Sequence, residues 1–202
     1  MWEKCSVFFL HRTFGTHGVE LSRRRFIQWV VFSGFASLSP NPVLAAIRDC
    51  MTPERSLSLY NPNTKEALDT TYWSNGNYVR KALADISHIM RDRRTGEIKR
   101  IDPRLLDVLH AIGMQLKTQE PFHIMSGYRS PQTNALLRKR GRAAAANSFH
   151  MQGKAVDICL PKCGLSSLRR VSSSLRSGGV GYYPRSGFVH VDVGPVRYWS
   201  DM

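Results

Sequence analysis

The chain has 202 residues, of which 42% are hydrophobic, 22% charged and 10% aromatic. This composition suits one globular domain of ordinary size with a tail, and it argues against wholesale disorder. No run approaches the length of uninterrupted apolar sequence that a membrane span needs, which excludes a protein with several spans. The chain is strongly basic, with 29 Lys and Arg against 15 Asp and Glu. Such a charge favours polyanionic surroundings, namely nucleic acid, anionic lipid or the bacterial wall.

A basic start, a short apolar stretch and small residues follow one another near the amino end. The sequence SRRRFI begins at Ser22, the apolar stretch ends at Leu38, and Ala45-Ala46 offers a cleavage point. These features predict a secretory signal, and the arginine pair is typical of the twin-arginine route. We therefore expect residues 1–46 to be an N-terminal extension with this signal, and residues 47–202 to be the working domain. A buried amphipathic helix behind a basic turn is the alternative interpretation.

Export to the periplasm narrows the choice of partners. The twin-arginine export machinery becomes an expected partner, whereas nucleic acid does not, because little of it lies outside the cytoplasm. The apolar stretch is short for a spanning helix, so we expect cleavage and no stable membrane span after processing. In an oxidising periplasm, Cys159 and Cys163 allow a local disulfide.

Hydrophobic periodicity predicts an α+β domain. In chain order we expect a hairpin over 57–72, helices over 77–90 and 103–116, a strand over 122–125, a helix over 130–142, a strand over 155–160, a short helix over 165–175, and strands over 179–183 and 188–193. Asp102 is a favourable N-cap ahead of Pro103 at the first helical position. In the helix over 130–142, Ala135, Leu136 and Leu137 are expected to face inward. Helices first and short strands later favour a small, mainly antiparallel sheet packed with helices.

The residues that carry candidate chemistry lie in the second half of the chain. His150 and Asp157 are separated by six residues, and His190 follows 33 positions after Asp157 on an alternating strand. Two neutral imidazoles and a carboxylate are a usual ligand set of catalytic zinc, with the fourth position left for water or substrate. Gly153 permits a tight turn that brings His150 toward Asp157. On spacing alone, packed or surface histidines remain the alternative.

Three motifs, in this order along the chain, resemble a family of zinc peptidases. They are S-G-Y-R-S over Ser126–Ser130, S-x-H-x-x-G-x-A-x-D over Ser148–Asp157 with His190 after it, and the segment Gly178–Trp199. The second motif resembles the LAS group, which contains lysostaphin-like enzymes, D-alanyl-D-alanine peptidases and the hedgehog signalling domain. The first resembles the D-alanyl-D-alanine peptidase branch, and the third the murein endopeptidase K family. The resemblance covers about residues 56–199.

The resemblance implies a hedgehog/D-alanyl-D-alanine peptidase-like fold and a zinc-dependent peptidase. It would cleave peptide cross-links of peptidoglycan, between two meso-diaminopimelate residues in the endopeptidase K type. By position, His150, Asp157 and His190 match the zinc ligands. Arg129 matches the arginine that steadies the developing oxyanion in the dipeptidase branch, a task suited to a permanently charged guanidinium. A surface cation or a structural ion pair is the alternative for Arg129.

One position departs from the family pattern. Dipeptidases of the group place a catalytic Glu three residues before the second His, where this chain has Gly187. Asp192 is the nearest carboxylate along the chain and shares the strand face of His190. It would be a catalytic general base or would orient a metal ligand, and the sequence leaves both open. A non-catalytic peptidoglycan-binding or metal-binding module on the same fold is the alternative to an enzyme.

Overall fold

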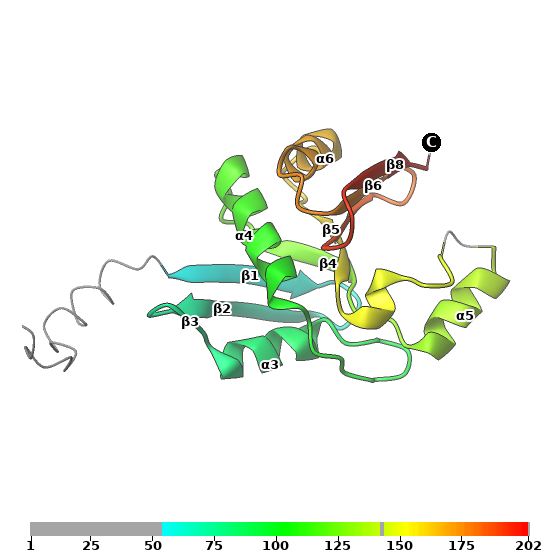
Figure 1. Ribbon diagram of the computed structural model, residues 1–202, viewed down its shortest axis with the longest axis horizontal. Helices are drawn as coiled ribbons and strands as arrows, with labels where there is room; N and C mark the ends of the chain where they lie inside the picture. Colours follow the sequence, from blue (N-terminus) through cyan, green and yellow to red (C-terminus); the bar gives the residue numbers. More distant parts are fainter. Residues whose placement is uncertain (1–53, 142–143, 202) are drawn as a thin grey trace, which may run out of the picture. The chain divides into compact units, whose positions relative to one another are not determined.

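A computed structural model describes residues 54–141 and 144–201, so the expected signal and the extension before it lie outside the described residues. Within these ranges the strands are β1 (Arg55–Asn61), β2 (Glu66–Ser74), β3 (Asn77–Tyr78), β4 (Phe122–Ser126), β5 (Ala155–Cys159), β6 (Gly179–Tyr183), β7 (Phe188–Asp192) and β8 (Arg197–Ser200). The helices are α3 (Arg80–Ile89), α4 (Pro103–Leu116), α5 (Pro131–Lys139), α6 (Leu165–Ser174) and the 3-10 helix η1 (Phe149–Gln152). The α+β class is confirmed (Figure 1).

The sheet is larger than predicted, and it is mixed, with both parallel and antiparallel strand pairs. Its eight described strands are ordered β3-β2-β1-β4-β5-β7-β6-β8. The pairs β1–β4 and β6–β8 are parallel, whereas the other five are antiparallel. A parallel pair needs a long crossover, and α3 and α4 lie in the connection from β1 to β4. The sheet is larger than expected because β3 and β8, which were not predicted as strands, lie at its two edges.

The predicted opening hairpin is present as β1 and β2. Leu57 and Leu59 are buried while Ser56, Ser58 and Tyr60 are more exposed, which is the alternation of a strand with one face on the core. Asn61 ends β1, and its side-chain amide donates to the carbonyl oxygen of Ile89 at 3.0 Å. The hairpin is thereby tied to the end of α3.

The first helix begins later than predicted. Asn77 and Tyr78 form β3 against β2, and α3 begins only at Arg80. The reason is the turn Asn75-Gly76, whose φ angles of 51° and 75° are both positive. Two such residues between strands are the signature of a tight hairpin, and this signal overrides the helical spacing that begins at Asn77.

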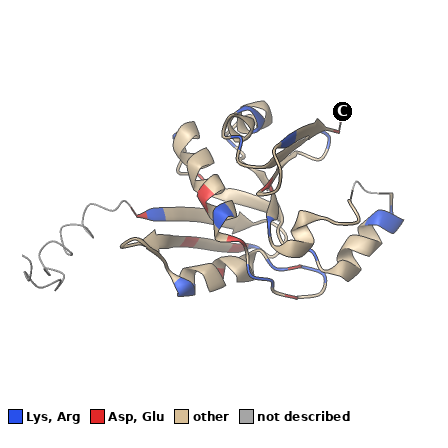
Figure 2. Ribbon diagram, viewed as in Figure 1, with Lys and Arg blue, Asp and Glu red and all other residues tan. Residues whose placement is uncertain are grey.

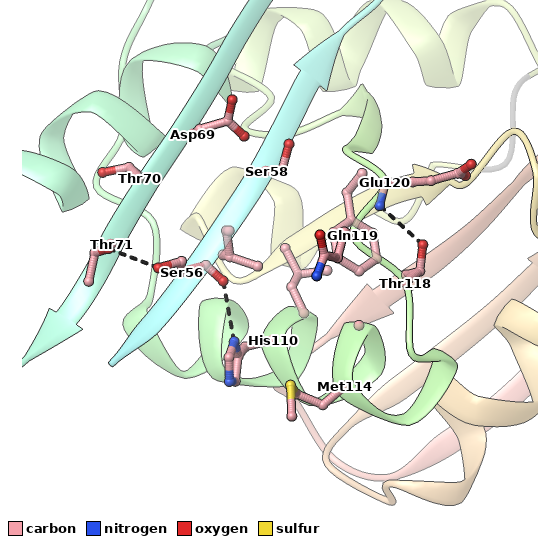
Figure 3. Close-up of a pocket in the computed structure, with 14 residues that line it drawn as sticks. Ser56, Ser58, Asp69, Thr70, Thr71, His110, Met114, Thr118, Gln119 and Glu120 are labelled. Carbon is pink, nitrogen blue, oxygen red and sulfur yellow. Dashed lines mark hydrogen bonds between the residues drawn. The ribbon is translucent and has the colours of Figure 1, made fainter. Parts of the chain in front are cut away.

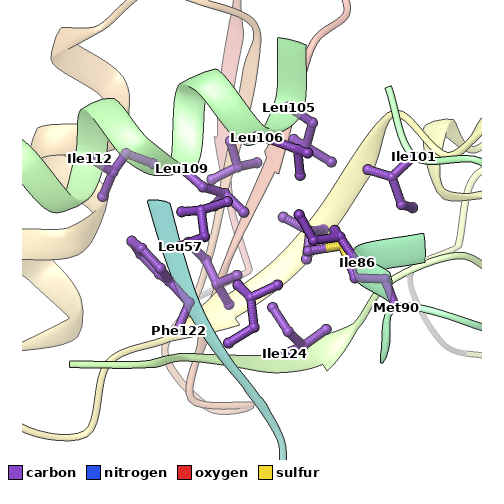
Figure 4. Close-up of a cluster of buried hydrophobic side chains, with 14 of the residues drawn as sticks. Leu57, Ile86, Met90, Ile101, Leu105, Leu106, Leu109, Ile112, Phe122 and Ile124 are labelled. Carbon is purple, nitrogen blue, oxygen red and sulfur yellow. The ribbon is translucent and has the colours of Figure 1, made fainter. Parts of the chain in front are cut away.

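The core lies where α4 packs against β1 and α6. Asp102 caps α4 by accepting from the backbone N–H of Arg104 at 3.0 Å, as the sequence predicts. The helix buries Leu105, Leu106, Leu109 and Ile112, and Figure 4 shows these side chains facing Leu57, Ile86, Met90, Phe122 and Ile124. Each fully buried leucine contributes about 1.5–3 kcal/mol to stability, so this cluster is the main support of the strands that follow.

The helix α5 does not bury the face predicted for it. Ala135 is exposed and Leu136 and Leu137 are only half-buried, whereas Thr133 and Asn134 are buried. Asn134 donates from its amide to the carbonyl oxygen of Ala145 at 3.0 Å, which ties α5 to the segment leading into η1. A polar contact therefore fixes the orientation of this helix.

Basic side chains are spread over several elements, as Figure 2 shows. Arg138, Lys139 and Arg140 at the end of α5 are all exposed, which fits a solvated basic surface. Across the described ranges, no helix combines the length and apolar character needed to span a membrane.

Candidate metal centre

Three donor side chains meet at the centre of the sheet, and we call them the donor triangle. They are His150 of η1, Asp157 of β5 and His190 of β7, all buried. His150 Nε2 lies 3.1 Å from His190 Nδ1 and 3.2 Å from Asp157 Oδ1. The third edge, from His190 Nδ1 to Asp157 Oδ1, is 2.9 Å. The structure thus brings together the three residues that the sequence predicted as ligands.

Local signals in the chain build the turn that carries His150. Ser148 caps η1, since its hydroxyl oxygen accepts from the backbone N–H of His150 at 3.3 Å. Gly153 ends η1 with φ of 67°, and a Cβ there would run into the carbonyl group of Arg100. Gly153 instead accepts from the N–H of Asp102 at 2.9 Å. The glycine is therefore required by both its conformation and its close approach to the chain before α4.

Strand register places the other two donors side by side. Asp157 and His190 are direct partners in the antiparallel pair β5–β7. Side chains opposite each other in such a pair lie on one face within contact distance. On the far side of β7, His190 is paired with Gly181, and the ring of Trp199 occupies the space that a side chain at Gly181 would take.

Each imidazole is held by a hydrogen bond on its outer nitrogen. His150 Nδ1 lies 2.7 Å from the carbonyl oxygen of Gly127 and must donate to it, because a carbonyl only accepts. His190 Nε2 lies 3.1 Å from Asp192 Oδ2 and donates to this carboxylate. These bonds leave His150 Nε2 and His190 Nδ1 to face the centre of the triangle as acceptors, which is the arrangement of metal-binding histidines.

Arg129 lies beside the donors, on the loop between β4 and α5. Its Nη2 donates to Asp157 Oδ2, the oxygen that does not face the histidines. Its Nε donates to the hydroxyl of Ser126 at 2.8 Å, and its backbone N–H to the carbonyl oxygen of His150 at 3.3 Å. The guanidinium is thus fixed next to the donor triangle rather than free at the surface.

Asp192 lies behind His190 and is fully buried. Its Oδ1 accepts from the N–H groups of Gly179 at 3.0 Å and Gly194 at 2.8 Å. Its Oδ2 accepts from His190 and, at 2.6 Å, from Arg197 Nη2. Burial opposes ionisation, but the hydrogen bonds from His190 and the two backbone groups lower the pKa of Asp192 to about 2. Of the two roles left open by the sequence, this geometry favours orienting His190.

The protonation states of the donors suit a cation. Burial lowers the pKa of His150 and keeps its imidazole neutral. Burial works against ionisation of Asp157, yet its histidine neighbours and Arg129 hold its pKa well below the usual range. Burial also opposes a charge on His190, but its bonds to Asp157 and Asp192 raise its pKa. A proton therefore competes with a metal mainly at His190.

The donor set fits zinc in chemistry and in spacing. Two imidazole nitrogens and one carboxylate oxygen are typical of a catalytic zinc site. Two ligands of a tetrahedral zinc ion, each at the usual bond length, are about 3.3 Å apart. The edges of the donor triangle, 2.9, 3.1 and 3.2 Å, are close to this spacing. No large rearrangement is needed to hold such an ion.

One aromatic residue that the sequence analysis did not single out, Trp199, lies against His190. The ring of Trp199 on β8 is 5.2 Å from that of His190, and its Nε1 donates to the hydroxyl of Tyr183 at 2.9 Å. Gly187 lies in the exposed turn between β6 and β7, with φ of 72°. The strand β8 was not predicted, so its contribution to the site was missed. The signal that could have found it is Tyr198-Trp199, two residues that favour strands.

Two other features do not belong to this site. Cys159 and Cys163 are free thiols in the described part of the chain. A cavity of about 450 Å³ lies between α4, β1 and β2, lined among others by Ser56, His110 and Phe122 (Figure 3). Phe122 begins β4, whereas Ser126 at the other end of β4 pairs with Asp157. The cavity is therefore at the opposite end of this strand from the donor triangle.

The fold and the buried donor triangle define a candidate metalloenzyme, and comparison with known proteins specifies which. A family model described as peptidoglycan L,D-endopeptidase MepK matches residues 50–199. The chain is 42% identical over 165 residues to peptidoglycan L,D-endopeptidase MepK of Escherichia coli (strain K12), across 81% of this chain and 89% of the relative. It is 38% identical over 178 residues to a probable peptidoglycan L,D-endopeptidase MepK of Haemophilus influenzae, across 86% of this chain and 94% of the relative. The chain belongs to the MepK family, which confirms the resemblance seen in its motifs.

Proposed function

We propose that this chain is a zinc-dependent endopeptidase of the periplasm that hydrolyses the peptidoglycan cross-link between two meso-diaminopimelate residues. Membership of the MepK family makes it a peptidoglycan endopeptidase. The observation that supports zinc is the donor triangle of His150, Asp157 and His190. The proposed fold is the one shared by D-alanyl-D-alanine peptidases and the hedgehog domain. Residues 1–46 would direct export by the twin-arginine route, and residues 47–202 would form the enzyme.

In this proposal the three donors hold the ion and the groups behind them keep the donors in place. A bound zinc ion would supply Lewis acidity to the carbonyl of the scissile bond. His150 is held by the carbonyl oxygen of Gly127 and His190 by Asp192, so each presents one fixed nitrogen. Such outer hydrogen bonds orient the ligand and raise its basicity.

Arg129 is the proposed electrostatic partner of the reaction. Hydrolysis of a peptide develops negative charge on the carbonyl oxygen, and a cation already in place stabilises it without reorganisation. The guanidinium is fixed by Asp157 on one side and Ser126 on the other, so its position is set before substrate arrives. Removing one donor of this kind usually costs about 10²–10³-fold in turnover.

Asp192 is proposed to orient His190 rather than to act as the general base. Five N–H groups, one each from Gly179, Gly194 and His190 and two from Arg197, already bind its two oxygens. It is fully buried behind the imidazole, whereas a base must reach the proton that it removes. Gly187 supplies no carboxylate in its place.

Purified cross-linked muropeptides test the proposal. Dimers joined through two meso-diaminopimelate residues should be split into monomers, and dimers joined through D-alanine and meso-diaminopimelate should stay intact. Removing the metal with a chelator should stop the reaction, and added zinc should restore it. Binding of dimers without cleavage, in the presence of zinc, would instead establish a peptidoglycan-binding module.

A further inference from the structure

Arg197 on β8 makes a bidentate contact, through both terminal nitrogens of its guanidinium, with the carboxylate of Asp192 behind His190. Nη2 donates to Asp192 Oδ2 at 2.6 Å, and Nη1 donates to Asp192 Oδ1 at 3.3 Å and to the carbonyl oxygen of Pro195 at 3.1 Å. A two-armed contact fixes the plane of a carboxylate as well as its distance. The same Oδ2 accepts from His190, so the orientation of this imidazole depends on that plane.

The guanidinium also lies against two aromatic rings that flank the histidines. Its central carbon is 5.1 Å from the ring centre of Phe149 and 5.0 Å from that of Trp199. Phe149 directly precedes His150 on η1, and the ring of Trp199 lies 5.2 Å from that of His190. Arg197 is therefore in contact with a neighbour of each histidine, on two elements that are otherwise distant in sequence.

Two glycines keep open the space that this arrangement needs. Gly179 is the parallel partner of Arg197, and a Cβ there would come within 2.8 Å of Arg197 Nη1 and 2.5 Å of Asp192 Oδ2. A Cβ at Gly194 would come within 2.5 Å of the ring of Phe149. Side chains at either position would push the guanidinium or the ring away, so the backbone is fitted to Arg197.

We propose that Arg197 is a positioning residue for the donor triangle: it holds His190 through Asp192, and the element of His150 through Phe149, at the separation that zinc requires. This inference rests on the proposed function of the triangle as a zinc site. A guanidinium suits the task because its planar fork matches the carboxylate and its faces stack on rings, which a lysine cannot reproduce.

The alternative is that Arg197 only fastens β8 to the sheet. A fastening role predicts that substitutions lower the stability of the fold and leave the metal affinity of the folded protein unchanged. A positioning role predicts a loss of affinity in protein that is still folded. Zinc affinity therefore separates the two roles, and hydrolytic activity alone does not.

The test compares Arg197→Lys and Arg197→Gln with the wild-type protein. The zinc Kd of each folded, metal-stripped protein is measured by competition with a chromophoric chelator, and the visible spectrum is recorded after cobalt substitution. We expect Kd to rise about 10–100-fold, the usual effect of losing a group that orients a ligand. The cobalt bands should shift, and turnover should recover in large part at saturating zinc. Arg185→Gln, in the exposed turn between β6 and β7, is the matched control and should match wild type in all three measurements.

The outcomes separate this inference from the function on which it rests. Wild-type protein that binds no zinc would overturn both. Tight zinc binding by the wild type, with the same Kd and cobalt spectrum in folded Arg197→Lys, would overturn the positioning role alone. The lysine variant keeps the charge and part of the stem packing, so it remains informative if the glutamine variant does not fold.

Discussion

Asp157 faces a histidine with one carboxylate oxygen and accepts from an arginine with the other: Oδ1 lies 2.9 Å from His190 Nδ1, and Oδ2 accepts from Arg129 Nη2. One side chain thereby joins the donor triangle to the cation proposed to stabilise the oxyanion. Arg129 lies on the loop between β4 and α5, and its bonds to Asp157 and Ser126 fix its distance from the donor triangle. The two groups are expected to respond differently to substitution, as the following predictions state.

Removing a histidine of the donor triangle should abolish both metal binding and hydrolysis. We expect His150→Ala or His190→Ala to lose about one equivalent of zinc, because two remaining ligands cannot hold the ion in place. Metal content by elemental analysis and muropeptide cleavage measure the two effects. His88→Ala is the control, since His88 lies at the surface beside Glu66. Full activity in either triangle variant would refute the assignment of the ligands.

Arg129→Lys should lower turnover while zinc content stays the same. A lysine keeps the charge but loses the fork that contacts Asp157 and Ser126 together, so the cation is no longer preorganised. We expect kcat to fall by about 10²–10³-fold. Steady-state kinetics on purified dimers, with metal analysis of the same samples, provide the measurement. An unchanged kcat would return Arg129 to a purely structural ion pair.

Asp192→Asn should weaken zinc binding rather than remove a base. We expect zinc affinity to fall about 10–100-fold and activity to recover when zinc is added, because the amide orients His190 less well. A general base would behave differently, with turnover down about 10²–10⁴-fold and zinc still bound. Titration of activity with zinc therefore decides between the two roles, and a normal rate with normal zinc content would remove Asp192 from the site.

Asp92 should make stability depend on pH. It is buried, and its carboxylate accepts from the N–H groups of Ser130 at 2.8 Å and Arg94 at 2.9 Å. Burial alone would raise the pKa of Asp92, but hydrogen bonds from Thr133, Ser130 and Arg94 hold it below its usual value. A carboxylate with a lowered folded-state pKa stabilises the fold above its unfolded value of about 3.9, and this contribution is lost as the pH falls through the folded value.

Asp92→Asn should therefore cost about 1.5–3 kcal/mol at pH 7, the usual contribution of hydrogen bonds to a charged group. Below about pH 4 the wild-type free energy of unfolding should fall more steeply than that of the variant, so the two converge. Urea unfolding at several pH values measures both. Asp85→Asn, in an exposed ion pair with Lys81, is the control and should change stability by less than about 1 kcal/mol.

Replacing Arg23 and Arg24 together by lysine should leave the precursor in the cytoplasm if the twin-arginine route is used. Cell fractionation measures this, with Arg25→Lys, beside the pair, as the control. Normal accumulation of the double variant in the periplasm would contradict the proposed route and leave the peptidase proposal untouched.

Local sequence signals predicted the elements whose causes are local. The cap at Asp102, Pro103 after it and the spacing of the leucines predicted α4, and the alternation of apolar and polar residues around His190 predicted β7. The predicted first residue of α3 was wrong. The turn Asn75-Gly76 gives a strong hairpin signal, but the prediction followed the helical periodicity instead. The prediction of which face of α5 is buried was also wrong. The contact of Asn134 with Ala145 orients the helix, and that contact depends on the fold.

The same distinction applies to the candidate site. The three donors could be named from spacing and family resemblance, since each lies in a recognisable motif. Asp192 was also named, with orientation of a ligand as one of its two possible roles. The carbonyl oxygen of Gly127 could not be, because it is a backbone atom without a sequence signature. Arg197 reaches Asp192 only because β8 pairs in parallel with β6, a non-local pairing that periodicity does not reveal.

The donor triangle takes one side chain from each of η1, β5 and β7, and β7 lies between β5 and β6 in the sheet. A chain in which β7 has not yet been inserted has no complete ligand set. Partly folded protein is therefore expected to be harmless to the wall that the finished enzyme cuts. Within the described part of the chain, assembly of the donor triangle therefore depends on the insertion of β7 between β5 and β6.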